Sequence, residues 1–234
     1  MFVVFKKEVS TYYSTPFGFI FMGIFLLLSG IMFFTYNLLG GGGDLNGLFG
    51  LLSNISFMIF PILTIKLFTD ERKAGTESLL LTSRLSPLQI VLGKYFAAVF
   101  VFVASLTATL VYVVILKIYG FPDLKAIAAS YLGFLLLGMA FIAVSTFTSA
   151  IADNYVTAAI ASFGALVGFV LIGVFSRSVQ TPVISDILSA LAITRQYDAF
   201  IKGVFSLGPI AYFIGFIVVF ISLSVFSFEG RRFN

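Results

Sequence analysis

Long apolar segments alternate with short polar connections along the whole chain. An α-helix needs about 20 predominantly apolar residues to cross the hydrocarbon core of a bilayer. Six segments have that length, which exceeds both a typical β-strand and the apolar core of a signal peptide. The connections leave no room for a soluble domain, so residues 1–234 are expected to form one all-α transmembrane domain. Its spans are predicted at 17–39, 47–68, 93–116, 127–150, 155–175 and 208–227.

The N-terminal segment 1–15 mixes apolar, aromatic and basic residues. At helical spacing its apolar side chains share one face, and Lys6 and Lys7 lie outside that stripe. The stripe consists of Phe2, Phe5, Val9, Tyr12 and Tyr13. This pattern predicts a helix that lies in the cytoplasmic interface, with its lysines toward the lipid headgroups.

The connection 176–207 before the last span contains two more apolar stripes, each too short to cross a membrane. The first stripe is Val183, Ile184, Ile187, Leu188 and Leu191, and the second is Tyr197, Phe200, Ile201, Val204 and Phe205. Two short outer helices are therefore expected, either interfacial or re-entrant, since exposed backbone is costly in lipid. We predict that the second stripe is buried and forms an outer gate at Tyr197, Phe200 and Ile201.

The polar run 70–84 separates the second and third apolar segments and begins with four consecutive charges, Asp70 to Lys73. In a chain that is 60% hydrophobic and only 10% charged, such a concentration of charge is expected to face water. The run also has the pattern of a short amphipathic helix. It is therefore the best candidate for a docking site for a soluble partner.

The lysines and arginines predict the orientation, because cytoplasmic loops of membrane proteins carry an excess of both. With the N-terminus inside, nine of these residues fall on the cytoplasmic side and five on the outer side. An even number of spans then places both termini in the cytoplasm.

Composition excludes several kinds of chemistry. The chain contains no Cys and no His, which removes disulfides, Cys/His metal sites, thiol nucleophiles and His general bases. No P-loop occurs, since Leu88 holds the first glycine position before Gly93-Lys94 and Tyr95 follows the lysine. Outside its apolar segments the chain contains no run of basic residues with interleaved aromatics, the pattern that is typical of nucleic-acid binding. We therefore expect no catalytic, cofactor-binding or metal-binding residues in this chain.

Charges are nearly absent from the centres of the spans. Lys66, Lys94 and Lys117 lie near span ends, where a lysine can extend its ammonium to the interface. This argues against a proton- or ion-coupled carrier, which typically needs a carboxylate or an unwound helix near the midplane. Small residues recur in spans four and five and are expected mainly to let these helices pack closely.

One motif is Asp70-Glu71-Arg72-Lys73-Ala74-Gly75-Thr76-Glu77-Ser78-Leu79-Leu80-Leu81-Thr82, followed by Gly93-Lys94-Tyr95. It resembles the cytoplasmic loop of ABC-2-type exporter permeases, although Ser78 replaces an apolar residue. Further similar stretches are Lys6-Lys7-Glu8-Val9 with Ser14-Thr15-Pro16-Phe17-Gly18, Ala152-Asp153-Asn154, and Tyr197-Asp198-Ala199-Phe200-Ile201-Lys202-Gly203-Val204. Within the family, the resemblance is nearest to the gliding-motility-associated permeases.

The resemblance implies a membrane subunit of the prokaryotic plasma membrane that pairs with a second copy or a homologue and with ABC ATPase subunits. ATP and Mg²⁺ would bind to those ATPases. The coupling helix would be the loop after span two, with contacts from Asp70, Glu71, Arg72, Lys73, Gly75, Thr76, Glu77, Leu79 and Leu80.

The sequence leaves two other interpretations of the function open: a membrane scaffold, and a channel or secondary carrier without an ATPase. An intramembrane enzyme is disfavoured, because the chain has no His and no carboxylate pair at membrane depth. Co-purification with a P-loop ATPase would separate the exporter from a carrier. The cargo is not specified, although a nearly uncharged, aromatic-rich interior favours amphipathic or lipid-linked solutes.

Overall fold

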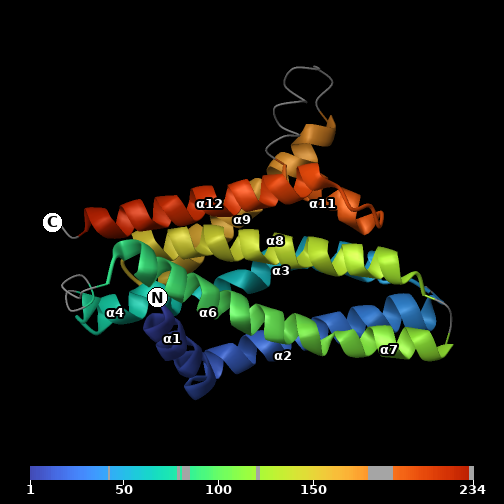
Figure 1. Cartoon of the computed structure of the whole chain (residues 1–234), viewed down its shortest axis with the longest axis horizontal. Helices are drawn as coiled ribbons and strands as arrows, with labels where there is room; N and C mark the ends of the chain where they lie inside the picture. Colours follow the sequence, from blue (N-terminus) through green and yellow to red (C-terminus); the bar gives the residue numbers. More distant parts are fainter. Residues whose placement is uncertain (42, 78–79, 81–84, 120–121, 179–191, 232–234) are drawn as a thin grey trace.

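The computed structural model describes residues 1–41, 43–77, 80, 85–119, 122–178 and 192–231. The described residues are 87% helical and contain no strand. The helices, shown in Figure 1, are α1 (Phe2–Ser14), α2 (Pro16–Phe33), the π-helix η1 (Phe34–Leu39), α3 (Asn46–Thr64), α4 (Lys66–Lys73), α6 (Pro87–Ala108), α7 (Leu110–Tyr119), α8 (Leu124–Ile151), α9 (Tyr155–Ser178), α11 (Ile193–Ile201) and α12 (Leu207–Gly230).

Six helical segments of the described chain are long and apolar enough to cross a membrane, which confirms the predicted number. They are Pro16–Leu39, Asn46–Lys73, Pro87–Tyr119, Leu124–Ile151, Tyr155–Ser176 and Leu207–Gly230. The third begins at Pro87, six residues before its predicted start, because Ser86 and Gln89 form a capping box there. The second continues to Lys73 and so includes the first charges of the polar run.

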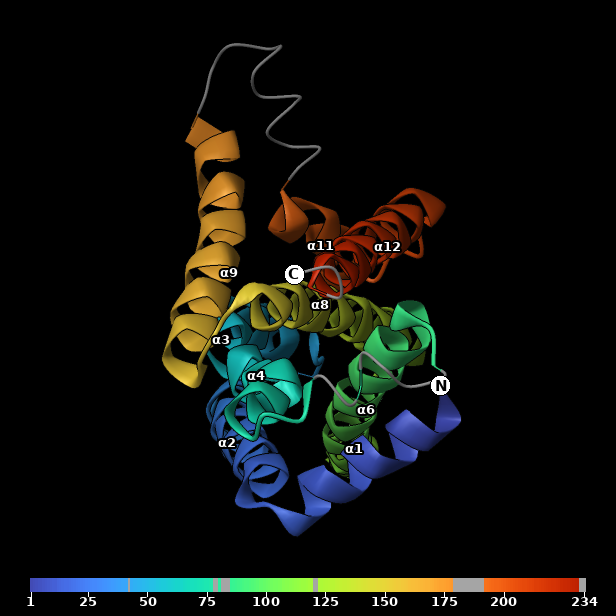
Figure 2. The same ribbon diagram turned by 90° about the vertical axis from the view of Figure 1, so that its left-hand side faces the viewer.

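Helix α8 lies at the centre of the bundle, between α3, α6, α9 and α12 (Figure 2). In its most apolar stretch 72% of the residues are buried, against 17% for α12. Two glycines make this position possible. A Cβ at Gly138 would lie 2.4 Å from the Phe102 ring, and one at Gly133 would lie 2.3 Å from Phe200 Cβ.

Aromatic rings fill the space between α2, α3, α6 and α8. Five buried phenylalanines form one cluster with ring centroids 5.0–6.1 Å apart: Phe21, Phe25, Phe60, Phe102 and Phe134. Hydroxyls add directional contacts, such as the 2.5 Å hydrogen bond between Thr148 of α8 and Ser162 of α9. These contacts agree with the packing role expected for the small residues of spans four and five.

Met1 and the C-terminal end of α12 lie at the same end of the bundle as α4 (Figure 1). We call this end, which holds α1, α4 and the C-terminal ends of α8 and α12, the polar end. The other end holds η1, α7 and α11. Near the C-terminus, Arg231 donates a 2.7 Å hydrogen bond to the Ile151 carbonyl of α8.

Helix α1 lies crosswise at the polar end and packs against α6 (Figure 2). The row of α1 that is buried within the chain is not the whole of its apolar stripe. Val4, Glu8 and Tyr12 form the buried row, whereas Phe2 and Tyr13 are exposed. Gly93 of α6 explains the difference, because Val4 sits where the Cβ of a larger residue would lie.

Candidate functional site after the second span

The polar run includes the end of α4, and its later residues Glu77 and Leu80 are also helical. Residues 78–79 and 81–84 lie outside the described residues. Asp70 to Lys73 form the last turn of α4, which follows directly from α3. Gly75 ends this helix with a φ of +67°, in the left-handed region. The Thr76 amide donates to the Glu71 carbonyl at 2.9 Å and the Gly75 amide to Arg72 at 3.0 Å, which together form a Schellman motif.

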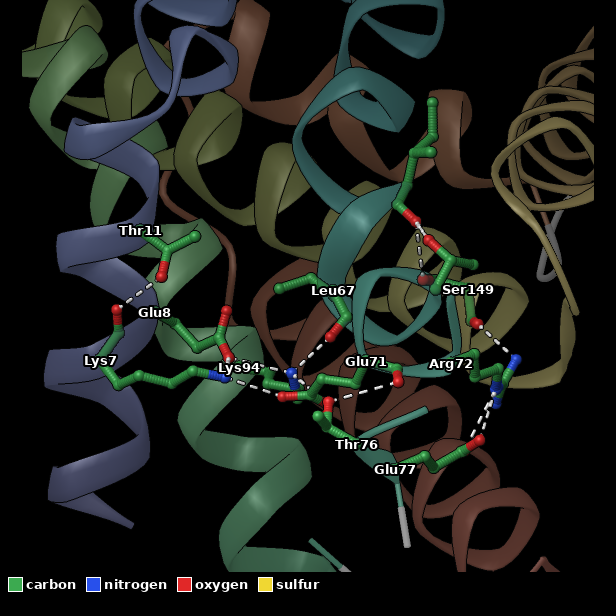
Figure 3. A network of polar contacts seen from close by, with 12 residues as sticks. Lys7, Glu8, Thr11, Leu67, Glu71, Arg72, Thr76, Glu77, Lys94 and Ser149 are labelled. Carbon is green, nitrogen blue, oxygen red and sulfur yellow. Dashed lines mark hydrogen bonds and ion pairs between the residues drawn. The ribbon is translucent and has the colours of Figure 1, made fainter. Parts of the chain in front are cut away.

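Glu71 is buried and pairs with two lysines from other helices (Figure 3). Its carboxylate accepts from Lys7 of α1 at 2.8 Å and lies 3.0 Å from the Lys94 ammonium of α6. Glu8 of α1 completes the group, at 3.0 Å from Lys94 and 3.1 Å from Lys7. We call Lys7, Glu8, Glu71 and Lys94 the ion cluster. It ties α1, α4 and α6 together.

Two sequence predictions are corrected by this cluster. Glu71 was expected to face water, but it is only 7% exposed. Lys94 was expected to extend to the interface, but it is 1% exposed and also donates to the Leu67 carbonyl. The physical reason is that two carboxylates and two ammonium groups neutralise one another, which removes most of the penalty for burying each of them.

The pKa values of the α1 members reflect the same balance. For Glu8, desolvation by burial would raise the pKa, but the charges of Lys94 and Lys7 outweigh it and lower the pKa. For Lys7, desolvation would lower the pKa, but the hydrogen bond to Glu71 and the Glu8 charge raise it. Burial raises the pKa of the nearby Tyr12 well above its usual value. Glu8 and Lys7 are therefore both ionised at neutral pH.

Arg72 reaches in the other direction, to the C-terminal end of α8. Its guanidinium donates to the carbonyls of Ser149, at 3.4 Å, and Ala150. The last carbonyls of a helix lack intrahelical partners and form the negative end of its dipole, so a cation is favourable there. Glu77 holds the guanidinium in place, with both oxygens at 3.1–3.2 Å from Nε (Figure 3).

Among the other described residues of the run, Asp70 and Lys73 contact Tyr155 of α9. Asp70 accepts a hydrogen bond from the Tyr155 hydroxyl, and the Lys73 ammonium lies 5.1 Å from the centre of the Tyr155 ring. Lys73 and Gly75 are exposed, Thr76 and Glu77 are partly buried, and Leu80 packs against the apolar core. Leu79 lies outside the described residues.

Sequence reasoning missed Glu8, Lys94 and Tyr155 as members of this site. One signal was present for Glu8, because it shares the i, i+4 row of Val4 and Tyr12 that becomes the buried face of α1. For Lys94 and Tyr155 the signal is weaker, since their partners are 23 and 85 positions away in sequence, at Glu71 and Asp70.

The predicted outer gate lies on α11, at the opposite end of the bundle. Tyr197 and Phe200 are buried, and the Tyr197 hydroxyl donates to the Phe49 carbonyl of α3 at 3.2 Å. Ile201 is partly buried and packs against the core. The Phe200 ring lies against Gly133 of α8.

The second apolar stripe is shorter than predicted. Val204 and Phe205, which were expected on its buried face, are 52% and 55% exposed. The reason is that α11 ends at Ile201 and the chain turns at Gly203, whose φ is +72°. The first stripe, 183–191, lies outside the described residues.

These features define a multi-pass α-helical membrane protein whose densest polar site lies at one end of the bundle. Residues 41–226, well over half of the chain, match the family described as ABC-2 family transporter protein. The chain belongs to this family and is therefore a permease subunit of an ABC transporter, the non-catalytic membrane component that associates with ABC ATPases. No curated protein matches the chain. The resemblance to the gliding-motility-associated subgroup stays a prediction.

Proposed function

We propose that this chain forms half of the translocation pathway of an ATP-driven exporter and is coupled to a separate ATPase through the segment after α4. One observation carries the proposal. The tip of α4 is exposed, whereas the turn directly before it contacts four other helices. Glu71 reaches α1 and α6, Arg72 reaches α8, and Asp70 reaches α9.

The contacts divide the predicted coupling residues into two groups. Lys73 and Gly75 would meet the ATPase, because the tip at 73–75 is exposed. Glu71, Arg72 and Glu77 would pass its movement to the spans, because they are held in contacts within the chain. ATP binding would close the ATPases, displace the tip and so move α1 and α8 together.

The same end would face the cytoplasm of a prokaryotic cell, across its inner membrane. An ATPase that uses cellular ATP must bind on that side. The nine-to-five distribution of lysines and arginines supports this orientation. Met1 and the end of α12 lie at the same end as α4, as the even number of spans requires.

A second copy of the chain, or a homologue, would pack against α9. This helix stands apart from the rest of the bundle over much of its length (Figure 2). Gly164 and Gly168 have open space where a Cβ would lie, which allows a second helix to approach closely.

We expect a cysteine at Ile160 to form an intersubunit cross-link more efficiently than one at Val218 of α12, which is exposed to a similar degree. Equal yields would argue against α9 as the interface.

Tyr197, Phe200 and Ile201 would close the pathway at the outer end. Their contacts with α3 and α8 support this role. Helix α8 connects the two ends of the bundle, because its C-terminal carbonyls accept from Arg72 at the polar end. The aromatic, nearly uncharged interior favours an amphipathic or lipid-linked cargo.

The proposal is tested by a charge reversal at the exposed tip. Lys73→Glu should reduce the stimulation of the partner's ATP hydrolysis in the reconstituted complex by roughly tenfold, since a docking contact worth about 1.4 kcal/mol changes an equilibrium tenfold. The matched control is Lys117→Glu, an exposed lysine at the opposite end. Wild-type stimulation in the Lys73 variant, or an equal loss in both variants, would contradict the proposal.

A further inference from the structure

A cavity of about 120 Å³ lies between α1, the beginning of α2 and the junction of α3 with α4. A water molecule occupies about 30 Å³ of liquid, so the cavity has room for a group several times that size. One wall is formed by the ion cluster, and another by the apolar side chains of Phe17, Ile62 and Leu63.

The charges around this cavity are balanced, with three lysines and three carboxylates. Four of them neutralise one another within the ion cluster. The two that remain are Lys66 and Asp70, which lie one helical turn apart on the same side of α4. The cavity therefore presents one positive and one negative group that are not paired with each other.

Lys66 is available to a ligand. Its ammonium lies 3.6 Å from the centre of the Phe17 ring, and it forms no ion pair with any carboxylate among the described residues. Asp70 accepts the Tyr155 hydroxyl on one oxygen, which leaves its second oxygen as an acceptor. Both residues are partly exposed.

Exposed apolar side chains follow Phe17 along α2 and offer a surface for acyl chains. Phe19 and Ile20, in the first turn of the α2 span, are 56% and 44% exposed. Thr11 and Thr15 line the cavity, and both use their hydroxyl hydrogen on backbone carbonyls of α1, at 3.0 and 2.8 Å. Their oxygen lone pairs are left to accept from a donor such as an ammonium group.

We propose that this cavity binds the headgroup of a membrane glycerophospholipid that carries both a phosphate and an ammonium group. Lys66 contacts the phosphate, Asp70 contacts the ammonium, and the acyl chains follow α2 past Phe19 and Ile20. A purely anionic lipid matches less well, because Asp70 opposes it. The bound lipid fixes α1 against the α3–α4 junction, next to the ion cluster.

Native mass spectrometry of the detergent-purified chain tests this site without any ATPase. Phosphatidylethanolamine and phosphatidylglycerol with identical acyl chains are titrated separately, together with free phosphoethanolamine. We expect phosphatidylethanolamine to bind at least fivefold more tightly than either of the other two. Lys66→Gln and Asp70→Asn should each weaken its binding at least fivefold, and Lys66→Arg should restore it. The control Lys6→Gln removes an equal charge from the exposed side of α1 and should have no effect.

Three results would overturn the proposal. Equal binding of phosphatidylglycerol, unaffected by Asp70→Asn, would indicate a simple anion site. Equal binding of free phosphoethanolamine would exclude a lipid. Cavity variants that behave like Lys6→Gln would place the lipid elsewhere. Far-ultraviolet circular dichroism of each variant identifies loss of fold, and Lys66→Arg, which keeps the charge, must then still bind.

Discussion

Lys94 is the residue on which the polar end depends most directly. Its ammonium lies between Glu8 and Glu71 and is 1% exposed. Removing one partner of a buried ion pair leaves an uncompensated charge and costs about 3–5 kcal/mol. The ion cluster is therefore a strong constraint on the position of α1, even if an apolar replacement of all four residues would be tolerated.

Lys94→Met should lower the free energy of unfolding by roughly 3–5 kcal/mol, because two glutamates then share only Lys7. The measurement is denaturant unfolding in mixed micelles, followed by circular dichroism. Lys6→Met, which removes an exposed lysine from α1, should change stability by less than about 0.5 kcal/mol. Equal stability of the two variants would show that the cluster is not coupled to folding.

The attachment of α1 should be lost in acid. The pKa of Glu8 is lowered below its usual 4.5, so its ionised form stabilises the folded state above that pH and this contribution disappears as pH falls through the folded pKa. The pKa of Lys7 is raised above 10.5, so its contribution is complete below pH 10.5 and is lost only at higher pH. Docking is therefore expected to be constant near neutrality and to weaken below pH 4.5.

A tryptophan can report this change, because the chain contains none. Phe5 of α1 packs edge-on against Phe100 of α6, with ring centroids 5.9 Å apart. In Phe5→Trp, the emission should shift to the red as the pH falls below 4.5. The same variant with Glu8→Gln should show a smaller acid transition. Identical acid transitions with and without Glu8→Gln would contradict the assigned role of Glu8.

At the scale of elements, the spans could be predicted from the sequence and the ends of the shorter helices could not. Hydrophobic length determines the spans, and each predicted range falls within or close to its helix. The course of the chain after Phe68 depends on Gly75 and on contacts with α1, α6 and α8 that are distant in sequence. For the same reason Glu71 and Arg72 were expected in water, and Val204 and Phe205 were assigned to a helix that ends at Ile201.

The contact between α11 and α8 gives a sharp test at this scale. In Gly133→Ala, the new Cβ would lie 2.3 Å from Phe200 Cβ and 2.6 Å from its Cγ, so α11 must move. Overpacking of this kind costs about 1–3 kcal/mol. We expect faster hydrogen exchange of the α11 amides. Gly215→Ala in α12, where no atom lies within 4 Å, should be neutral or slightly stabilising, because Ala favours helix over Gly by about 1 kcal/mol. Unaltered hydrogen exchange of the α11 amides in the Gly133 variant would contradict the proposal that α11 forms the gate.

At the scale of the whole molecule, the exposed tip of α4 and the buried α8 form one connected path from the polar end to α11. The tip is linked through Arg72 to the end of α8, and α8 contacts Phe200 at Gly133. This continuity is what the proposed coupling requires. The sequence predicted the tip and the gate separately, but the link between them depends on tertiary contacts.

The most direct test of the account is a cross-link from the tip to the partner. The chain has no native cysteine, so Ala74→Cys carries a single thiol on the exposed turn after α4. A heterobifunctional reagent applied to membranes that contain the tagged chain, followed by mass spectrometry, identifies whatever is attached. Asp44→Cys, exposed at the opposite end, is the control. The account predicts a P-loop ATPase at position 74 and none at position 44. Attachment at position 44 instead, or the absence of any nucleotide-binding protein at position 74, would contradict it.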